Sequence, residues 1–301
     1  MKILIIGGSR FVGPLVVNKL LEKNHDVVVF NRGKSDSEKE KLDYKKIQFI
    51  QGDRNEGFNK IKNEIFDVII DTCAFKGEQI KKSIDKLKFD YYLNFSTVAV
   101  YKKTDNFPLK EESEVGDWPF WGDYNKGKVE CENILKEESI KKGFKYANIR
   151  PVYILGKNNY PNREPSIYRK IYYNNPPQDL ILPGKNGEER IHFVFAEDVA
   201  KAMVLLAEKQ PEGNFNCCGD ESTIVTLNKF VNLMMDVVGK TIEIKYEEKL
   251  DKKMPTVKDF PFSNEEFYCK NDKIKKELGV NFTPLFEGLK RDYDEYYKNI
   301  I

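Results

Sequence analysis

The 301-residue chain carries 50 Lys and Arg residues against 48 Asp and Glu residues, so its formal net charge is only +2. This balance excludes a strong electrostatic attraction to nucleic acid or to an anionic membrane, and the length suits one large domain or two closely packed ones. Five cysteines without a Cys-x-x-Cys pair, and only two histidines, argue against a disulfide framework and a zinc site. Without a signal peptide or a bilayer-spanning apolar run, we expect a cytoplasmic protein with reduced cysteines and no membrane partner.

The first thirteen residues, MKILIIGGSRFVG, predict a strand, a glycine turn and the start of a helix. Residues 3–6 are an unbroken apolar run, which is typical of a strand buried on both faces of a parallel sheet. Gly7 and Gly13, with the N–H groups of the helix start, would let a phosphate approach closely. Arg10 replaces the middle glycine of a G-x-x-G-x-x-G pattern. An ordinary tight turn is the alternative, but the flanking strand and helix favour a dinucleotide site.

A second buried strand is predicted at residues 26–30, and Asn31-Arg32-Gly33 follows it. At this strand end an acidic residue would bind the 2′-hydroxyl of NAD, whereas an arginine accommodates the 2′-phosphate of NADP. The acidic residue is absent, and Arg10 and Arg32 could converge on one site. We therefore expect NADP as the favoured cofactor and keep NAD as the alternative. Two merely solvated arginines are the competing explanation.

Strand-like and helical patterns alternate through the rest of the first half. The strands are expected at 47–50, 67–70, 91–95 and 146–149, and the helices at 58–65, 80–87 and 124–138. This alternation predicts an α/β fold with a doubly wound parallel sheet of the Rossmann type. Such sheets bind ligands at the carboxyl ends of their strands. One edge should therefore gather the residues that follow the strands, namely Gly7, Asn31, Asp53, Asp71 and Thr97.

Beyond Gly156 the sequence is richer in Asn, Pro and Tyr. Helices are expected at 167–173, 198–207, 227–238, 271–278 and 285–297, and strands at 191–195, 213–216 and 241–245. We assign residues 1–156 and about 188–218 to a Rossmann domain, and residues 157–187 and 219–301 to a smaller, interleaved substrate-binding lobe. The irregular stretch 102–123 is long enough to suggest a function. Candidate pocket walls, each also explained by packing alone, are Trp118, Trp121, Tyr153, Tyr160 and His192.

Tyr124 and Lys128 lie four residues apart, which places them on one face of a helix. A lysine ammonium near a phenol lowers its pKa from about 10, so Tyr124 could act as a general acid and base. Thr97 could hydrogen-bond the same substrate oxygen. Tyr-x-x-x-Lys also arises by chance, but its position behind a dinucleotide turn favours a catalytic role. Cys73, by contrast, fits a small buried residue better than a nucleophile.

The chain resembles an extended or atypical short-chain dehydrogenase/reductase of the NAD-dependent epimerase/dehydratase group over nearly its whole length. The matching segments are GGSRFVG at Gly7, NRG at Asn31, GDR at Gly52, STVAVY at Ser96, YNKGK at Tyr124, RPVYILG at Arg150, AEDVAKA at Ala196 and TPLFEGL at Thr283. Several of them are most similar to chloroplast stem-loop-binding proteins and their bacterial relatives.

The resemblance implies that Thr97, Tyr124 and Lys128 are catalytic and that Lys128 also holds the nicotinamide ribose. The predicted cofactor contacts lie in the glycine turn and after the strands: Gly7, Ser9, Arg10, Phe11, Val12, Gly13, Asn31, Arg32, Asp53, Arg54, Cys73, Ala74, Lys128 and Pro151. Dimerisation through two helices, near Ile80 and Tyr124, is a further expectation from the resemblance.

The sequence departs from the group at three places. Val98 and Ala99 stand where dehydratases carry Asp-Glu, and Tyr153 stands where sugar-nucleotide epimerases usually have Asn. Ile191 occupies the position of an arginine that clamps the substrate diphosphate, although Arg190 is adjacent. These departures argue against a nucleotide sugar as the substrate, but they do not affect the predicted cofactor.

The predicted function is an NAD(P)-dependent epimerase or oxidoreductase that acts on a hydroxyl or carbonyl group of a small molecule, with nucleotide sugars among the candidates. One alternative is an RNA-binding or RNA-processing protein on the same scaffold. The balanced charge and the lack of an arginine-rich segment argue against nucleic acid as a partner without removing it. A cofactor-binding sensor without turnover is the other alternative.

Overall fold

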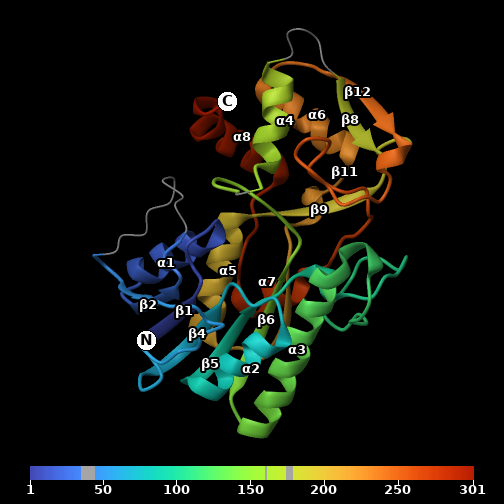
Figure 1. Cartoon of the computed structure of the whole chain (residues 1–301). Helices are drawn as coiled ribbons and strands as arrows, with labels where there is room; N and C mark the ends of the chain where they lie inside the picture. Colours follow the sequence, from blue (N-terminus) through green and yellow to red (C-terminus); the bar gives the residue numbers. More distant parts are fainter. Residues whose placement is uncertain (35–44, 160, 174–178) are drawn as a thin grey trace.

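The computed structural model describes residues 1–34, 45–159, 161–173 and 179–301 (Figure 1). A sheet of seven strands, in the order β10-β6-β5-β4-β1-β2-β3, forms its base. All neighbouring strands in it run parallel, which confirms the predicted Rossmann-type sheet. The strands are β1 (Lys2–Ile6), β2 (Asp26–Asn31), β3 (Gln48–Gln51), β4 (Ile65–Asp71), β5 (Lys88–Phe95), β6 (Lys145–Pro151) and β10 (Gly213–Cys217).

Helices cover both faces of this sheet. Helix α1 (Val12–Glu22) packs on α5 (Ala196–Lys209) on one face, and α2 (Gly77–Lys86) packs on α3 (Gly122–Lys142) on the other (Figure 1). Successive strand residues point to opposite faces, so alternate residues of β1 enter two different cores. Ile3 and Ile5 join the α1 and α5 side chains, whereas Leu4 and Ile6 join those of α2 and α3. The unbroken apolar run of β1 follows from this double burial.

The remaining elements gather beyond the carboxyl edge of the large sheet, apart from α7 (Asp272–Leu278), which contacts α5 and β10 (Figure 1). They are a sheet of β11 (Ile224–Thr226), β9 (Arg190–Phe195) and β7 (Tyr153–Leu155), a pair of β12 (Glu243–Glu247) and β8 (Asp179–Pro183), and the helices α4 (Arg163–Tyr172), α6 (Leu227–Val238) and α8 (Leu285–Glu295). The chain leaves the large sheet after β6 and returns through α5 to β10, so the two groups are interleaved. The domain limits given above stay a prediction.

One predicted helix is wrong. Residues 58–65 form successive tight turns, in which the Ile61 N–H donates to Phe58 O at 2.9 Å and the Glu64 N–H to Ile61 O at 3.1 Å, before β4 begins at Ile65. Only Phe58 and Ile61 of the segment are fully buried before β4, which is too little apolar surface to hold a helix against the sheet. Strands β7, β8 and β11 were not predicted; β7 and β11 have three residues each, too few to establish a period.

The carboxyl ends of the central strands meet at one edge, as predicted. Asn31, the last residue of β2, donates through Nδ2 to Gly7 O, after β1, at 2.9 Å. Thr72 Oγ1, after β4, accepts from the Gly8 N–H and donates to Ile6 O, both at 3.0 Å. These bonds tie three neighbouring strand ends into one rim around the glycine turn. Within the described ranges, no helix has the length and apolar character needed to cross a membrane.

Candidate active site

The glycine turn is tightly closed. A β-carbon on Gly7 would lie 2.4 Å from Thr72 Oγ1, and one on Gly13 would lie 2.6 Å from the Gly8 carbonyl carbon, so both positions require glycine. Phe11 has a φ of 52°, which is a strained conformation for a bulky residue. The first turn of α1 contains no acidic side chain. The positive end of this helix is therefore suited to an anion such as a dinucleotide phosphate.

Two of the predicted cofactor residues extend this edge towards β2. Asn31 holds the turn through Gly7 O, and its Oδ1 accepts from the Gly33 N–H at 2.8 Å. Arg10 and Arg32 are both exposed, on the turn after β1 and on the segment after β2. Both residues thus lie at neighbouring strand ends, and their role in the choice of cofactor stays a prediction.

Arg54 is already engaged by the protein. Its Nη1 and Nη2 donate to the two oxygens of Asp71 at 2.6 and 2.8 Å, and Nη2 also donates to Gln79 O. Although burial raises the pKa of Asp71, this ion pair holds it below its ordinary value. Asp53 accepts from the Asn55 N–H at 2.8 Å. Arg54 thus braces the strand ends, and its predicted cofactor contact stays a prediction.

Cys73, Ala74 and Pro151 also lie at the strand ends. The Cys73 sulfur is 3.6 Å from Ile6 O and 3.5 Å from Arg54 Nη1, and burial raises the pKa of its thiol. A raised pKa disfavours the nucleophilic thiolate. Ala74 is fully buried, and Pro151 is buried at the end of β6. Cys73 thus lies beside Gly7 of the turn, whereas Pro151 lies three strands away from β1, at the end of β6.

The three predicted catalytic residues come together. Thr97 follows β5, Tyr124 is in the first turn of α3, and the Thr97 side chain is close enough to lower the pKa of the Tyr124 hydroxyl, against the rise that burial causes. Lys128, one turn further along α3, is only 2 % exposed, and its Nζ donates to Phe95 O at 2.6 Å. Nζ also lies 4.9 Å from the centroid of the Phe75 ring. The lysine is therefore fixed at the end of β5, beneath Tyr124.

The predicted effect of Lys128 on Tyr124 is wrong for this structure. Burial raises the pKa of Tyr124 above its ordinary value, and the groups that lower it are the Thr97 side chain and the charge of Arg163. The burial is partial, because 42 % of Tyr124 remains exposed. Burial also lowers the pKa of Lys128. At neutral pH Tyr124 is therefore a protonated phenol, ready to donate a proton.

Two residues that the sequence reasoning passed over fix α3 in place. Asn125 Nδ2 donates to Ala99 O at 2.6 Å and to Gly116 O at 2.8 Å, which ties the start of α3 to the loop after Thr97. A β-carbon on Gly127 would lie 2.1 Å from Phe75 O. Glycine inside a helix costs stability, so its presence in YNKGK was a signal of close approach.

The residues predicted to form pocket walls lie in different environments. Trp118 is buried and donates to Glu265 Oε1 at 2.8 Å, so it belongs to the core. His192 is fully buried between Gly219 O and the Cys269 N–H, and burial lowers its pKa to about 4, so it is a neutral packed residue. Trp121 and Tyr153 contact each other with ring centroids 6.3 Å apart. Tyr160 lies outside the described residues.

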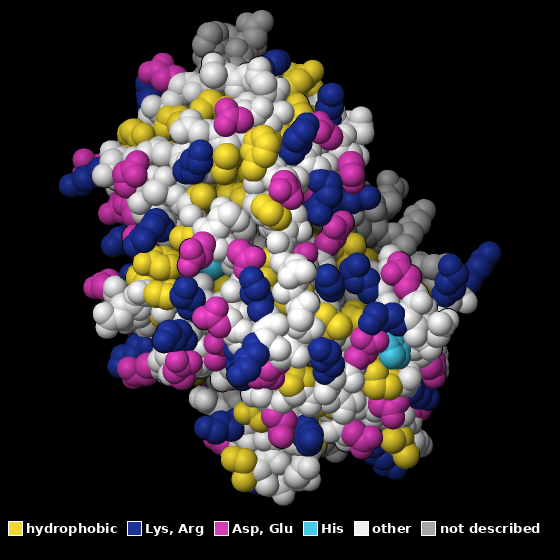
Figure 2. All heavy atoms as spheres, turned by 180° about the vertical axis from the view of Figure 1, so that it is seen from behind, with side chains coloured by type: hydrophobic (Ala, Val, Ile, Leu, Met, Phe, Trp, Pro, Cys, Tyr) yellow, Lys and Arg dark blue, Asp and Glu magenta, His cyan; other side chains and the backbone are white. Residues whose placement is uncertain are grey.

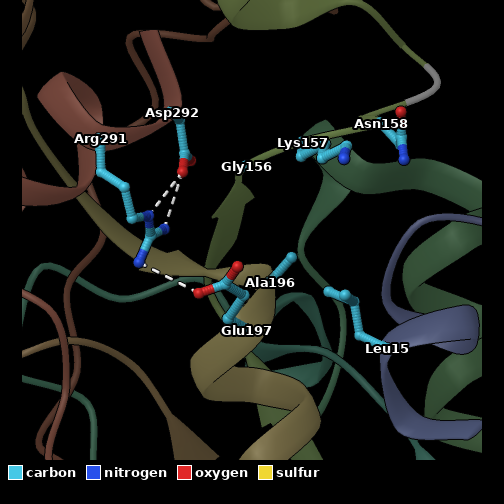
Figure 3. A pocket seen from close by; sticks show the side chains of 8 residues that line it. All are labelled: Leu15, Gly156, Lys157, Asn158, Ala196, Glu197, Arg291 and Asp292. Atoms are coloured by element: carbon cyan, nitrogen blue, oxygen red, sulfur yellow. Dashed lines mark hydrogen bonds and ion pairs between the residues drawn. The ribbon is translucent and has the colours of Figure 1, made fainter. Parts of the chain in front are cut away.

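One pocket is lined by charged residues and contains none of the three predicted catalytic residues. It lies between α1, α5, α8 and the segment after β7, and Figure 3 shows Arg291 directed at Asp292 and Glu197. The guanidinium is 2.8 Å from Asp292 Oδ1 and 3.1 Å from Glu197 Oε2. The cation is thus balanced within the pocket. Among the residues that the structure describes, no His, Cys, Asp and Glu cluster suits a metal ion.

The sequence model of the NAD dependent epimerase/dehydratase family matches residues 3–218. The chain belongs to this family. It is 30 % identical to the chloroplast stem-loop binding protein of 41 kDa b from Arabidopsis thaliana, over 97 % of the chain and 78 % of that relative. It is 24 % identical to a putative UDP-glucose 4-epimerase of Methanocaldococcus jannaschii, over 96 % of both proteins. The resemblance stated from the sequence is therefore confirmed.

Two solved structures have the same fold as this family member. The UDP-glucose 4-epimerase of Thermotoga maritima with UDP-glucose has a TM-score of 0.79 at 20 % identity, with both chains fully covered. The UDP-glucuronic acid 4-epimerase of Bacillus cereus with NAD has a TM-score of 0.77 at 16 % identity, over 100 % of this chain and 99 % of that one. The NAD dependent epimerase/dehydratase family is a family of enzymes, which confirms the prediction that this chain is a family enzyme.

The departures from this family's pattern have structural consequences. Val98 and Ala99 are buried in a short 3₁₀ turn after Thr97, so they add apolar packing where dehydratases were expected to carry acids. Ile191 is fully buried, and the neighbouring Arg190 is paired with Glu266 at 2.9 Å. Neither position presents a cation to the Tyr124 site.

Proposed function

We propose that this family member is an NAD(P)-dependent epimerase or oxidoreductase that acts on a hydroxyl or carbonyl group of a small molecule. The observation that carries the proposal is the convergence of the Thr97 and Tyr124 side chains, with the buried Lys128 one turn further along α3. A tyrosine and a threonine converging on one point can hold a substrate oxygen and move its proton. The neighbouring glycine turn would supply a phosphate-binding site of the kind that dinucleotides need.

The residues of the turn fit a nicotinamide dinucleotide. Gly7 and Gly13 leave room that a side chain would fill, and α1 presents its positive end without an acidic side chain. When bound, the nicotinamide supplies an acceptor and donor of hydride. Lys128 would hold the nicotinamide ribose, as the resemblance implies.

The catalytic residues would handle the proton. Thr97 donates a hydrogen bond that fixes the substrate oxygen, and Tyr124 exchanges a proton with it. As a phenol, Tyr124 gives its proton to a carbonyl oxygen during reduction; as a phenolate, it takes the proton of a hydroxyl during oxidation. Because burial raises the pKa of Tyr124, the phenol is the resting form. An epimerase would use both directions in one turnover.

We propose NADP as the favoured cofactor, with NAD as the alternative. Support comes from Arg10 and Arg32, which are exposed at adjacent strand ends, and from the absence of an acidic residue at positions 31–33. The family description names NAD, and the Bacillus cereus neighbour was crystallised with NAD. The preference therefore depends on these two arginines and on the missing acidic residue.

Nucleotide sugars are the substrate class to test first. The Methanocaldococcus relative and both solved neighbours are named as epimerases of UDP-sugars. The test is to incubate the purified protein with NAD⁺ or NADP⁺ and a panel of nucleotide sugars, and to separate the products. We expect a new epimer or a keto product together with transient cofactor reduction. Binding of neither dinucleotide would remove the proposal.

Binding of structured RNA is a second proposal, suggested by the name of the Arabidopsis relative. Phosphate backbones require clustered Lys and Arg side chains. On the face shown in Figure 2, Lys and Arg are interspersed with Asp and Glu, without a broad area of one sign. The observation on that face disfavours RNA. A titration of a stem-loop RNA at several salt concentrations decides, because phosphate contacts would give salt-dependent affinity.

We also propose a homodimer through α2 and α3. Their outer surface carries charged pairs, such as Lys81 with Asp85 at 2.5 Å and Lys142 with Asp85 at 2.6 Å. An interface there would be polar, and such pairs would have to re-form between the subunits. The molar mass in solution at low and high salt tests this proposal: a monomer in both would contradict it.

A further inference from the structure

Arg163 begins helix α4 and reaches towards the aromatic side of the candidate active site. Its guanidinium carbon lies 5.2 Å from the centroid of the Tyr153 ring and 5.9 Å from that of Phe262. The side chain is half-buried. Stacking on two rings holds the planar guanidinium in a defined orientation while its N–H edges stay available.

This arginine has no acidic partner within ion-pair distance among the residues that the structure describes. The buried arginines Arg54 and Arg150, by contrast, are paired bidentately, Arg54 with Asp71 and Arg150 with Glu132 at 2.9 and 2.6 Å. Glu164, the sequence neighbour, instead accepts hydrogen bonds from the Gly156 N–H and from Asn159 Nδ2. A partly buried cation without such a partner is costly, and the cost is offset when an anion binds.

The position of Arg163 is also unfavourable for its own helix. The start of a helix carries partial positive charge, so a cation is disfavoured there and an anion is favoured. Helix formation therefore gives no reason for a cation at this place. A ligand anion would interact favourably with both the guanidinium and the helix start.

The guanidinium acts on the reacting group. Burial raises the pKa of Tyr124 and of Tyr153, and the charge of Arg163 opposes the rise in both. Ring contacts place Arg163 at the same site: its guanidinium stacks on Tyr153, and the Tyr153 and Trp121 rings lie 6.3 Å apart. Trp121 is the N-cap of α3, three residues before Tyr124. An anion bound by Arg163 would thus lie within one small substrate of the oxygen that Tyr124 contacts.

We propose that Arg163 is a specificity-determining residue that binds a carboxylate or phosphate of the substrate on which Tyr124 acts. The inference rests on the proposed function and names its substrate class, a small molecule with an oxyanion near the reacting hydroxyl. Guanidinium is suited to this role because its fork matches both anions bidentately. Lys128 and Arg190 cannot replace it. Lys128 donates to Phe95 O, and Arg190 is paired with Glu266.

The test uses substrate pairs that differ in one anionic group. UDP-glucuronate adds a carboxylate to UDP-glucose, and glucose 6-phosphate adds a phosphate to glucose. For the preferred anion we expect Arg163→Met to lower kcat/KM about 10- to 100-fold, mainly through KM, as for a lost charged hydrogen bond. If Arg163 binds a carboxylate, the variant should have a lower kcat/KM for UDP-glucuronate alone. If it binds a phosphate, kcat/KM should fall for glucose 6-phosphate and for both nucleotide sugars. Arg163→Lys should restore part of the loss.

The control is Arg169→Met, which removes an exposed arginine from the same helix and should leave all substrates unaffected. An equal loss for neutral and anionic substrates in Arg163→Met would mean a packing role and would overturn the proposal. Unchanged kinetics for every anionic substrate would overturn it as well.

A binding measurement separates this inference from the proposed function. Calorimetric titrations of UDP-glucuronate and glucose 6-phosphate compare Tyr124→Phe with Tyr124→Phe/Arg163→Met, where no turnover is needed. We expect one anion to bind the first protein and to bind the second about 10- to 100-fold more weakly. Absent turnover in the wild type would remove the proposed function alone. Equal affinities, or no binding of either anion to the parent, would overturn the role of Arg163.

Discussion

The side chain of Thr97, directly after β5, lies close enough to the Tyr124 hydroxyl in the first turn of α3 to lower its pKa, against the rise that burial causes. Thr97 Oγ1 also accepts from the Ala99 N–H at 3.2 Å, which fixes the hydroxyl oxygen in place. The pair defines one point at which a substrate oxygen would meet two hydroxyl groups. The activity should depend on both.

Replacing Thr97 by valine removes the hydroxyl at nearly constant volume. We expect turnover to fall about 100-fold, as when one donor to a reacting oxygen is lost, with the fold retained. Thr97→Ser keeps the hydroxyl and should stay within a few-fold of wild type. The measurements are kcat with the identified substrate and thermal unfolding of both variants. A well-folded Thr97→Val protein with wild-type kcat would contradict this role.

Adding a methyl group to Gly127 should displace α3. The new β-carbon would lie 2.1 Å from Phe75 O, so the helix or the Phe75 loop must move. We expect Gly127→Ala to cost about 1–3 kcal/mol of unfolding free energy and to reduce turnover, because Tyr124 and Lys128 share this helix. Gly116→Ala is the control, since its nearest neighbour would be 3.5 Å away. Denaturant unfolding measures both; equal stability of the two variants would contradict the close approach.

The NADP preference should disappear with its arginines. We expect Arg10→Ala and Arg32→Ala each to weaken NADP binding about 10-fold and to leave NAD binding nearly unchanged, since only NADP carries the 2′-phosphate. Arg169→Ala serves as the charge-matched control on α4. Calorimetric titration of each dinucleotide gives the affinities. Equal losses for NAD and NADP, or wild-type preference for NAD, would contradict the assignment.

Glu164 should make stability depend on pH. Burial raises its pKa to about 7, and the charge of Asp292 adds to the rise, so the native state holds a proton that the unfolded state releases near pH 4.5. Unfolding free energy should therefore fall as the pH rises from about 5 to about 7 and level off above that. A shift from 4.5 to about 7, at about 1.4 kcal/mol for each pH unit, corresponds to roughly 3 kcal/mol.

Glu164→Gln should flatten this dependence. Asn159 Oδ1, which has no partner among the described residues, can accept from the new amide once Asn159 rotates. The control is Glu137→Gln, an exposed position on α3 that should leave the pH dependence unchanged. Denaturant titrations at about pH 5 and about pH 8 compare the three proteins. If the unfolding free energies of the wild type and of Glu164→Gln fell equally between the two pH values, the buried carboxyl would not be the source of the pH dependence.

Local patterns predicted most of the fold. Helix α6 spans residues 227–238, as predicted, because it is long and strongly amphipathic, and β1 follows from its apolar run. The helix expected at 58–65 failed because two buried residues cannot anchor it. Strands such as β7 are too short for periodicity to reveal. Those parts are decided by tertiary pairing rather than by local propensity.

The candidate site was predictable where it depends on strand ends and helix spacing. Thr97, Tyr124 and Lys128 were placed together by these rules. The pKa of Tyr124 was not, because burial and the charge of Arg163 depend on packing between segments far apart in the chain. Arg163 itself follows no motif, and only the packing of its guanidinium on the Tyr153 and Phe262 rings positions it.

The most direct test of the central claim is cofactor reduction in Tyr124→Phe. Rapid mixing of the dinucleotide complex with substrate, followed by the absorbance of the reduced nicotinamide, measures the chemical step alone. We expect a loss of at least about 100-fold in rate with unchanged dinucleotide affinity, as for removal of a general base. Tyr173→Phe, an exposed tyrosine, is the control and should behave as wild type. A wild-type rate in Tyr124→Phe would contradict the account.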